Sequence, residues 1–201
     1  MRRLGEEKPA AWYDEVFAGS TKYARHYAKT KYYALWSVVV DRLVRSGSRS
    51  VVELGCGSGQ FASLLRDKGF RDYLGIDFSA VAVAQATGRC PELSFEVDDV
   101  LSSRVLETRA YDAVVCLEVL EHVEEDRSVL ERIRPGALVF ASVPNFPAAA
   151  HVRHFESERE VLDRYGALFE RPTVDAHLVD PGGGTKHFLL EGVRLGDQGA
   201  W

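Results

Sequence analysis

The sequence predicts a doubly wound α/β domain with a mostly parallel seven-stranded sheet, an antiparallel last strand and a small helical cap at the N-terminus. Three observations predict it. A glycine loop follows the first apolar strand, further apolar strands alternate with helical segments, and two β-rich segments close the chain. Alternating strands and helices imply parallel pairing with helices on both faces of the sheet. We expect residues 1–48 to form the cap and residues 49–201 the main domain, within one structural unit.

Length and composition indicate a soluble globular protein with one core. The chain has 201 residues, of which 46% are apolar and 27% charged. No apolar run approaches the roughly 20 residues that a membrane-spanning helix needs. The first residues, MRRLGEEKPAAW, do not form a signal peptide, and three cysteines without CxxC spacing predict reduced thiols. We therefore expect a cytoplasmic protein with no membrane partner.

The net charge of −5 argues against a broad nucleic-acid footprint. We expect a small-molecule partner and no nucleic acid. The composition leaves the oligomeric state open.

The elements follow one another with clear boundaries. Residues 22–46 contain no proline or glycine and repeat apolar residues at helical spacing, which predicts one long helix ended by Gly47. The PGGGTK turn allows the last two strands to pair antiparallel. The expected strands are Ser50–Leu54, Tyr73–Ile76, Leu93–Val97, Ala113–Leu117, Leu138–Val143, Thr173–Val179 and His187–Leu195. The expected later helices are Gly59–Lys68, Ala80–Thr87, Val119–Ile133 and Ser157–Tyr165.

The segment VVELGCGSGQF, residues 51–61, is the most specific sequence in the chain. An apolar strand delivers Glu53, and glycines follow at positions 55, 57 and 59, where missing side chains let the backbone approach a ligand. Asp77 ends the next strand, where a carboxylate can bind the hydroxyls of a ribose. A nicotinamide-binding loop would instead need glycine at position 60, which is Gln60.

This pattern resembles the class I S-adenosylmethionine (SAM)-dependent methyltransferases, which have a Rossmann-like fold, and in particular the ubiquinone-biosynthesis O-methyltransferase-like group. The resemblance implies that SAM is the cofactor, with Glu53 near the methionine amino group and Asp77 on the ribose. It also implies that Asp99, or alternatively Asp98, contacts the adenine amine. The cofactor-binding residues expected on this basis are Glu53, Gly55, Gly57, Gly59, Asp77, Phe78, Asp98, Asp99 and Leu117.

The segment CLEVLEHVEED, residues 116–126, places Glu118, Glu121 and His122 within five positions. On a helix these side chains share one face, so they can hold a metal ion or form the acidic first turn of an ordinary helix. Similar ExxEH segments ligate a divalent cation in the ubiquinone-biosynthesis enzymes and in the small-RNA terminal 2′-O-methyltransferases. The resemblance implies Mg²⁺, Mn²⁺ or Zn²⁺ on Glu118, Glu121 and His122, with His151 or His154 as a fourth ligand.

The resemblance implies transfer of a methyl group to a small-molecule acceptor, and we expect the acceptor atom to be a hydroxyl oxygen. Because a hydroxyl must lose its proton, a base or a cation is useful, and His122, His151 and His154 are the candidate catalytic bases. N-methylation of a small amine and a SAM-binding protein without activity are the alternatives. The N-terminal aromatics are expected either to cover the cleft and line the acceptor pocket or to pack as plain core.

Overall fold

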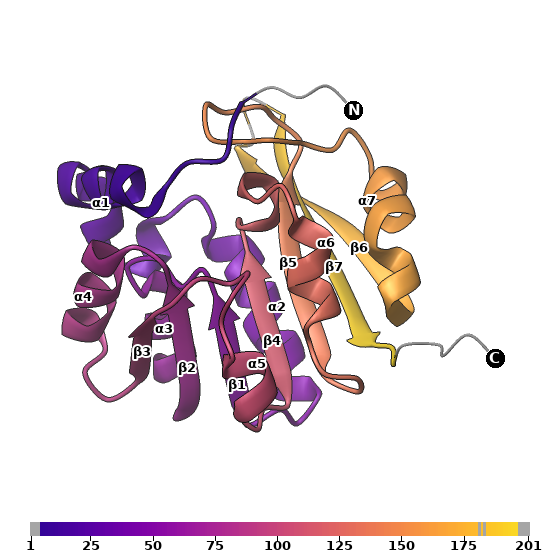
Figure 1. The fold of residues 1–201 in the computed structure, drawn as a ribbon, viewed down its shortest axis with the longest axis horizontal. Coiled ribbons are helices and arrows are strands. Elements are labelled where there is room, and N and C mark those ends of the chain that lie inside the picture. The colour runs from indigo at the N-terminus through magenta and orange to yellow at the C-terminus, as the bar shows by residue number, and fades with distance from the viewer. Residues whose placement is uncertain (1–4, 181, 183, 197–201) are drawn as a thin grey trace.

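The computed structural model describes residues 5–180, 182 and 184–196. Its centre is a seven-stranded sheet in the order β3-β2-β1-β4-β5-β7-β6 (Figure 1). Strand β7 is antiparallel to both of its neighbours, and the pairings from β3 to β5 are parallel. This confirms the predicted fold class. The strands are β1 (Ser50–Leu54), β2 (Asp72–Asp77), β3 (Ser94–Val97), β4 (Ala113–Leu117), β5 (Leu138–Pro144), β6 (Phe169–Asp180) and β7 (Thr185–Arg194).

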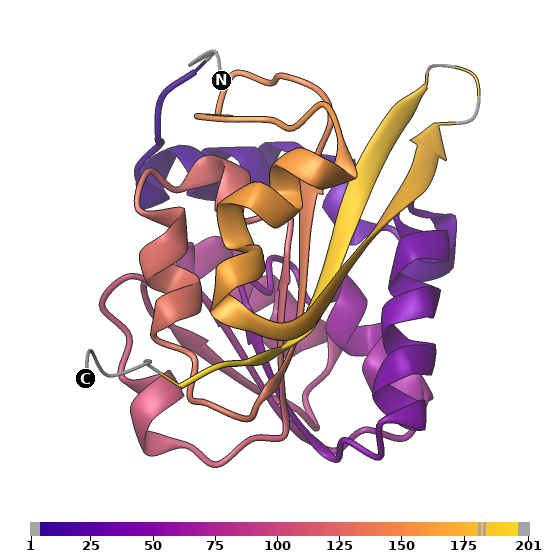
Figure 2. The same ribbon diagram turned by 90° about the vertical axis from the view of Figure 1, so that its right-hand side faces the viewer.

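Helices cover both faces of the sheet. Helix α2 lies on one face, and α6 and α7 lie on the other (Figure 2). Helix α1, which the sequence patterns did not delimit, lies beside α4 (Figure 1). None of the helices in the described ranges is long and apolar enough to cross a membrane. The helices are α1 (Ala10–Gly19), α2 (Tyr33–Arg45), α3 (Gln60–Asp67), α4 (Ala80–Arg89), α5 (Val105–Thr108), α6 (Asp126–Glu131) and α7 (Glu158–Tyr165), with 3-10 turns η1 (Thr21–Ala24), η2 (Tyr27–Lys29), η3 (Leu120–His122) and η4 (Gly166–Leu168).

Strands β1 and β4 are neighbours at the middle of the sheet, and every residue of β4 is buried. The chain leaves β1 toward β2 on one side and leaves β4 toward β5 on the other. Because parallel strands share one carboxyl edge, the loops after β1, β2 and β4 meet there. Open α/β sheets bind ligands in the crevice at such a reversal of strand order.

The glycine loop after β1 needs its glycines. Gly55, Gly57 and Gly59 all have positive φ, a backbone conformation that favours glycine. A Cβ atom on Gly55 would lie 2.3 Å from Val119 Cγ2, and one on Gly59 would lie 2.9 Å from the Cα atom of Ala86. The first contact couples the loop after β1 to the segment after β4, and the second lets α3 approach α4 closely.

The prediction of one continuous helix over residues 22–46 is wrong. The structure has the short turns η1 and η2 followed by α2. Arg25, between the two turns, has an extended backbone, and its carbonyl accepts a hydrogen bond from the Gln60 side chain at 2.8 Å. Hydrogen bonds from a distant helix thus override the local helical pattern.

The prediction of one helix from Val119 to Ile133 is also wrong. The structure has η3, an extended residue at Val123 and then α6. The Arg153 guanidinium accounts for the break, because it donates to the carbonyls of Leu120, Val123 and Glu124. Carbonyls bound in this way are withdrawn from the hydrogen-bond ladder that a continuous helix would need.

The final hairpin is longer than predicted, since β6 begins at Phe169 and continues to Asp180. Its start was missed because ERPT interrupts the apolar pattern, and the pairing is irregular between Glu170 and Thr173. Two residues of the predicted PGGGTK turn, at positions 181 and 183, lie outside the described residues, as do 1–4 and 197–201.

Candidate active site

A cavity of about 570 Å³ lies at the carboxyl edge of the sheet. Its walls come from the ends of β1, β2 and β4, the glycine loop, the loop after β5 and the N-terminal segment. Gly59 and Asp98, two of the predicted cofactor residues, are not in the wall. The predicted cofactor residues that line it are Glu53, Gly55, Gly57, Asp77, Phe78, Asp99 and Leu117.

Asp77 joins the glycine loop to the start of α4. The side chain is 6% exposed, and its two oxygens accept hydrogen bonds from the backbone N–H groups of Gly57 and Ser79, each at 2.9 Å. Burial raises the pKa of the Asp77 carboxyl, and the two backbone hydrogen bonds oppose that rise. Asp14, which belongs to none of the motifs, accepts hydrogen bonds from the Ser79 hydroxyl at 2.6 Å and the Val81 N–H at 3.1 Å.

Glu53 is a buried carboxyl on β1. The Tyr73 hydroxyl donates to it, and its side chain lines the cavity. Burial raises the pKa of Glu53 to about 8, although the Tyr73 hydrogen bond acts in the opposite direction. Carboxyls with strongly raised pKa values inside a cleft are typical of functional sites.

These residues fit the chemistry of SAM. Glu53 lies one residue before the end of β1, and Asp77 ends the neighbouring strand β2. The positive φ angles of the glycines leave the loop backbone open to a ligand. The Phe78 ring lies 5.1 Å from the Tyr13 ring, which gives the cavity an aromatic wall. The volume of the cavity lies in the range of roughly 300–1,000 Å³ that small-molecule sites occupy.

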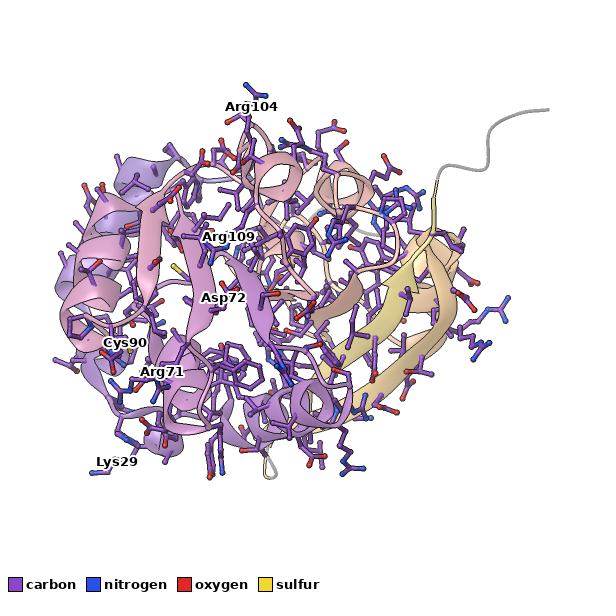
Figure 3. The ribbon with its side chains drawn as sticks, turned by 90° about the horizontal axis from the view of Figure 1, so that it is seen from below. Lys29, Arg71, Asp72, Cys90, Arg104 and Arg109 are labelled. Carbon is purple, nitrogen blue, oxygen red and sulfur yellow. The ribbon has the colours of Figure 1, made fainter. Side chains whose placement is uncertain are left out.

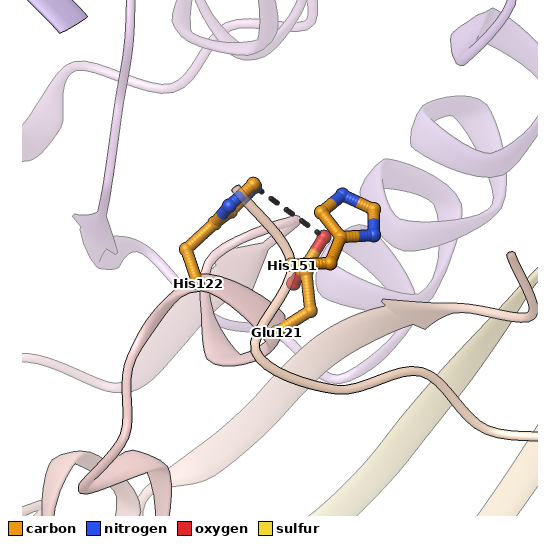
Figure 4. A group of neighbouring side chains, drawn as sticks. All are labelled: Glu121, His122 and His151. Carbon is orange, nitrogen blue, oxygen red and sulfur yellow. Dashed lines mark ion pairs between the residues drawn. The ribbon is translucent and has the colours of Figure 1, made fainter. Parts of the chain in front are cut away.

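A second cluster lies in the same cavity. Glu121, His122 and His151 each offer a ligand atom, and these atoms lie within 4.8 Å of one another (Figure 4). Glu121 is completely buried, and neither of its carboxyl oxygens has a hydrogen-bond partner among the described residues. Burial raises the pKa of this carboxyl well above its ordinary value, with Glu118 adding to the rise. Oε1 lies 3.8 Å from Nε2 of His122, which is too far for a hydrogen bond (Figure 4). A buried carboxyl without a hydrogen bond is costly, which marks it as a group arranged for a ligand.

Nε2 of both histidines is free to bind a metal ion or to accept a proton. Nδ1 of His122 lies 2.9 Å from the Ala150 carbonyl, and Nδ1 of His151 lies 3.0 Å from the Phe146 carbonyl. A carbonyl only accepts, so each Nδ1 carries the proton and each Nε2 keeps a lone pair. Burial lowers the pKa of both rings, that of His151 to about 4 with His122 contributing, so both are neutral at neutral pH.

Glu118, the first predicted metal ligand, lies outside this cluster. It has a positive φ of 59°, and its carboxylate accepts hydrogen bonds from the Ser142 hydroxyl at 2.7 Å and from Nδ1 of His187. His187 is fully buried on β7 and was missed, because a single histidine in an apolar strand carries no spacing signal. His154, the remaining candidate base, does not line the cavity.

Arg153 fixes the position of the cluster. It is 2% exposed, its guanidinium donates to the three carbonyls after β4 described above, and it pairs with Asp126 at 3.2 Å. The neighbouring Val152 N–H donates to the Glu121 carbonyl at 2.8 Å. The segment that carries Glu121 and His122 is thereby held against the loop that carries His151. From the sequence, only the two histidines of the HVRHF segment, residues 151–155, were proposed as functional residues, and Arg153 was missed.

The fold and the glycine loop define a class I methyltransferase domain. The family described as "Methyltransferase domain" matches residues 23–172, and the chain belongs to it. The resemblance expected from the sequence is therefore confirmed.

Two curated relatives agree with this class. A probable S-adenosylmethionine-dependent methyltransferase of Mycolicibacterium smegmatis is 32% identical over 113 residues, which are 54% of this chain and 43% of that protein. The ubiquinone biosynthesis O-methyltransferase of Pseudomonas fluorescens is 31% identical over 114 residues, which are 53% of this chain and 49% of that protein. The chain thus matches about half or less of the length of these relatives.

Two solved structures share the fold. The methyltransferase domain of bacterial CtHen1-CN has a TM-score of 0.62 at 23% identity, with 79% of this chain and 96% of that chain covered. Magnesium protoporphyrin IX methyltransferase from Synechocystis, solved with bound SAM, has a TM-score of 0.60 at 23% identity, with 82% of this chain and 80% of that chain covered.

Proposed function

We propose that the protein binds SAM and transfers its methyl group to a hydroxyl of a small-molecule acceptor. The observation that carries the proposal is the buried carboxyl of Glu121, which has no hydrogen bond within the described residues and lies 3.8 Å from Nε2 of His122. This carboxyl and two neutral imidazoles line the cavity that is also lined by most of the predicted cofactor residues. The relative named as a ubiquinone biosynthesis O-methyltransferase supports oxygen as the acceptor atom.

In this proposal one side of the cavity holds the cofactor. SAM supplies an electrophilic methyl group on a positively charged sulfur, so the protein mainly has to align the acceptor and exclude water. The Glu53 carboxyl would meet the methionine amino group, Asp77 the ribose hydroxyls and Asp99 the adenine amine. Phe78 and Leu117 supply apolar wall.

On the acceptor side, the lone pairs of His122 and His151 can receive the proton that a hydroxyl must lose. With Glu121 they can equally hold a divalent cation, which would lower the pKa of a bound acceptor hydroxyl. Oxygen and imidazole ligands suit Mg²⁺, Mn²⁺ or Zn²⁺. A catechol is the natural acceptor for such a site, because two adjacent oxygens can bind one cation.

We also propose that residues 1–48 act as a cap over this cavity. Tyr13, Phe17, Tyr32 and Trp36 line it, and the Tyr13 ring lies 5.9 Å from the His122 ring. Asp14 ties α1 to the start of α4 through the hydrogen bonds described above. These contacts support a role in excluding water from the site.

The test is turnover with matched acceptors. Catechol, phenol and a small aliphatic amine should be compared by the release of S-adenosylhomocysteine, with and without a chelator. We expect methylation of catechol, loss of activity in the chelator and recovery with added Mg²⁺ or Mn²⁺. Methylation of the amine alone would contradict the oxygen assignment. Full activity in the chelator would exclude a role for a cation, and the histidines would then act as the bases.

The affinity for SAM should rise with pH up to about 8. The Glu53 carboxyl, whose pKa burial raises to about 8, is largely protonated in the free protein at neutral pH. The ammonium group of SAM favours the ionised carboxylate, so binding releases a proton and strengthens by up to about tenfold per pH unit below that pKa. Near pH 8 the gain ends, because the carboxyl is then ionised and the amino group begins to lose its own proton.

Calorimetry in buffers of different ionisation enthalpy measures this proton release. Glu53→Gln is the control and should bind SAM without the pH dependence. If the affinity of the wild type for SAM did not change between pH 6 and about 8, Glu53 would not be the residue that binds the amino group of SAM.

A further inference from the structure

We infer that Glu118 recognises a second polar hydrogen on the acceptor, next to the methylated hydroxyl, and that His187 positions Glu118 for this task. Glu118 follows β4 and His187 lies on β7, and the two side chains meet at Oε1 of Glu118. Glu118 lines the same cavity as Glu121 and His122. The inference rests on the proposed function, because it concerns which acceptors the same site takes.

Only one oxygen of the Glu118 carboxylate is occupied. Oε1 accepts a hydrogen bond from the Ser142 hydroxyl at 2.7 Å and another from Nδ1 of His187. Oε2 receives no hydrogen bond from the described residues, and it is not a fully buried atom. The side chain is 18% exposed and lines the cavity, so Oε2 is the oxygen that a bound molecule can reach.

The backbone and Ser142 fix the direction of this carboxylate. The Glu118 N–H donates to the Ser142 hydroxyl oxygen at 3.1 Å, which leaves the proton of that hydroxyl to point at Oε1. Glu118 also has a φ of 59°, a conformation that residues other than glycine rarely adopt. Strain of this kind persists where the surrounding structure enforces it, and it is concentrated at functional sites.

His187 has no other polar partner among the described residues. Its side chain is fully buried and does not line the cavity, and its ring centre lies 5.4 Å from that of Tyr32 and 5.5 Å from that of Phe146. An ionised carboxylate only accepts, so Nδ1 of His187 carries the proton, and the buried Nε2 has no hydrogen bond. Burying an imidazole in this way is costly, and the hydrogen bond to Glu118 offsets part of the cost.

The charge of Glu118 acts on the residues of the proposed acceptor site. Burial raises the pKa of Glu121, and the Glu118 carboxylate raises it further. Burial lowers the pKa of both His122 and His151, and the same carboxylate opposes that lowering. The free oxygen of Glu118 is therefore near the proposed position of the methylated hydroxyl.

A carboxylate oxygen that is open to a cavity matches a polar hydrogen. A hydrogen bond to a charged group is roughly twice as strong as one between neutral groups. A site built for such a donor rejects an analogue that lacks it, because the group of the protein is then left unpaired. We therefore expect acceptors in which a hydroxyl or an ammonium group stands next to the methylated oxygen.

The experiment measures kcat/KM for three phenols that differ in this neighbouring group. Catechol carries a hydroxyl, 2-(aminomethyl)phenol carries an ammonium, and guaiacol keeps both oxygens of catechol but has lost the second polar hydrogen. Wild type should prefer catechol or 2-(aminomethyl)phenol over guaiacol by about 10- to 100-fold. Whichever of the two wild type prefers identifies the donor as a hydroxyl or as an ammonium.

Glu118→Gln should abolish this preference or turn it toward guaiacol. Ser142 and His187 both donate, so they hold the amide oxygen in the place of Oε1. The amide NH₂ then takes the place of Oε2 and donates into the cavity, where the methoxy oxygen of guaiacol can accept. The ratio of the kcat/KM values for catechol and guaiacol measures the change.

Two variants of His187 test its positioning role. His187→Leu should weaken the preference, whereas His187→Asn, whose amide nitrogen can replace Nδ1, should retain it. A merely structural role would lower kcat/KM for all the phenols equally. His177→Leu is the matched control and should keep the wild-type preference, because His177 lies opposite His187 on β6 and does not line the cavity. Glu118→Gln keeps the test decisive if His187→Leu does not fold.

Equal kcat/KM values for the phenols in wild type would overturn the inference, and so would an unchanged preference in Glu118→Gln. If Glu118→Gln lost as much affinity for Mn²⁺ as Glu121→Gln, Glu118 would be a cation ligand and the inference would also be wrong. Failure of the proposed function would be distinct, because wild type would then bind no SAM or methylate none of the phenols, and the inference would fall with it.

Discussion

Replacing Asp77 by alanine should weaken SAM binding by roughly 10- to 100-fold. In the proposed site the carboxylate binds the ribose hydroxyls, and hydrogen bonds to a charged group contribute about 1.5–3 kcal/mol each. The same oxygens hold the Gly57 and Ser79 N–H groups, so the variant also loosens the glycine loop. Isothermal calorimetry with SAM measures the loss.

Asp72→Ala is the matched control for this prediction. Asp72 begins β2 at the opposite edge of the sheet and pairs with Arg109 at 2.6 Å (Figure 3). Its replacement should leave SAM affinity unchanged. Asp77→Asn, which keeps one acceptor oxygen, should fall between alanine and wild type. Wild-type affinity in Asp77→Ala would mean that the cofactor does not lie against the end of β2.

Glu121→Gln should lower turnover by about 100-fold or more and, in the presence of a chelator, stabilise the folded protein. The amide has nearly the same shape, but it cannot act as an anionic ligand. It also removes a buried carboxyl that has no hydrogen-bond partner within the described part of the chain, and such a group destabilises the native state. Methyl transfer and thermal melting measure the two effects.

The stabilising effect of Glu121→Gln should depend on pH. Burial raises the pKa of Glu121 in the folded protein above its unfolded value. Ionisation of this group therefore costs the folded protein no stability below the unfolded pKa, and stability is lost as pH rises from there through the folded pKa. Glu121→Gln should remove that part of the decline. Melting temperatures of the two proteins that run parallel across this pH window would contradict the assignment.

Glu125→Gln is the control on the same segment. Glu125 is exposed and does not line the cavity. Both its turnover and its melting temperature should match wild type. Undiminished turnover in Glu121→Gln would exclude Glu121 from the reaction, whatever the effect on stability.

The parallel part of the sheet could be predicted almost residue by residue. The bounds of β1 and β4 agree with the sequence prediction, and those of β2 and β5 differ by one residue at most at either end. The central strands β1, β2, β4 and β5 are covered on both faces, so each is a mostly apolar run that stands out from its neighbours. The glycine loop was equally clear, because positive φ and close backbone approach leave few alternatives to glycine.

The two wrong helices have a common physical cause. The Gln60 side chain donates a hydrogen bond to the Arg25 carbonyl, and Arg153 donates to carbonyls of the segment after β4. In each case the competing donor lies far along the chain, so no periodicity within the segment could show it. Local helical spacing predicts a helix only where tertiary contacts leave the backbone free.

Spacing along the chain could point to only part of the cluster of Glu121, His122 and His151, again because contacts distant in sequence shape it. Glu121 and His122 are neighbours in one motif, and His151 was one of two histidines proposed from the loop after β5. Glu118 belongs to the same motif, but its backbone turns the side chain toward Ser142 and His187. A left-handed residue and a partner on the last strand cannot be inferred from spacing along the chain.

The Arg153 anchor has a consequence for how this region can vary. Its guanidinium grips carbonyl oxygens of Leu120, Val123 and Glu124, and every amino acid supplies that oxygen. The backbone shape of the turn is therefore insulated from the identity of those three side chains, of which Val123 lines the cavity and Leu120 is buried in the core. Arg153 itself has no such freedom, because a lysine lacks the planar fork that reaches several acceptors at once.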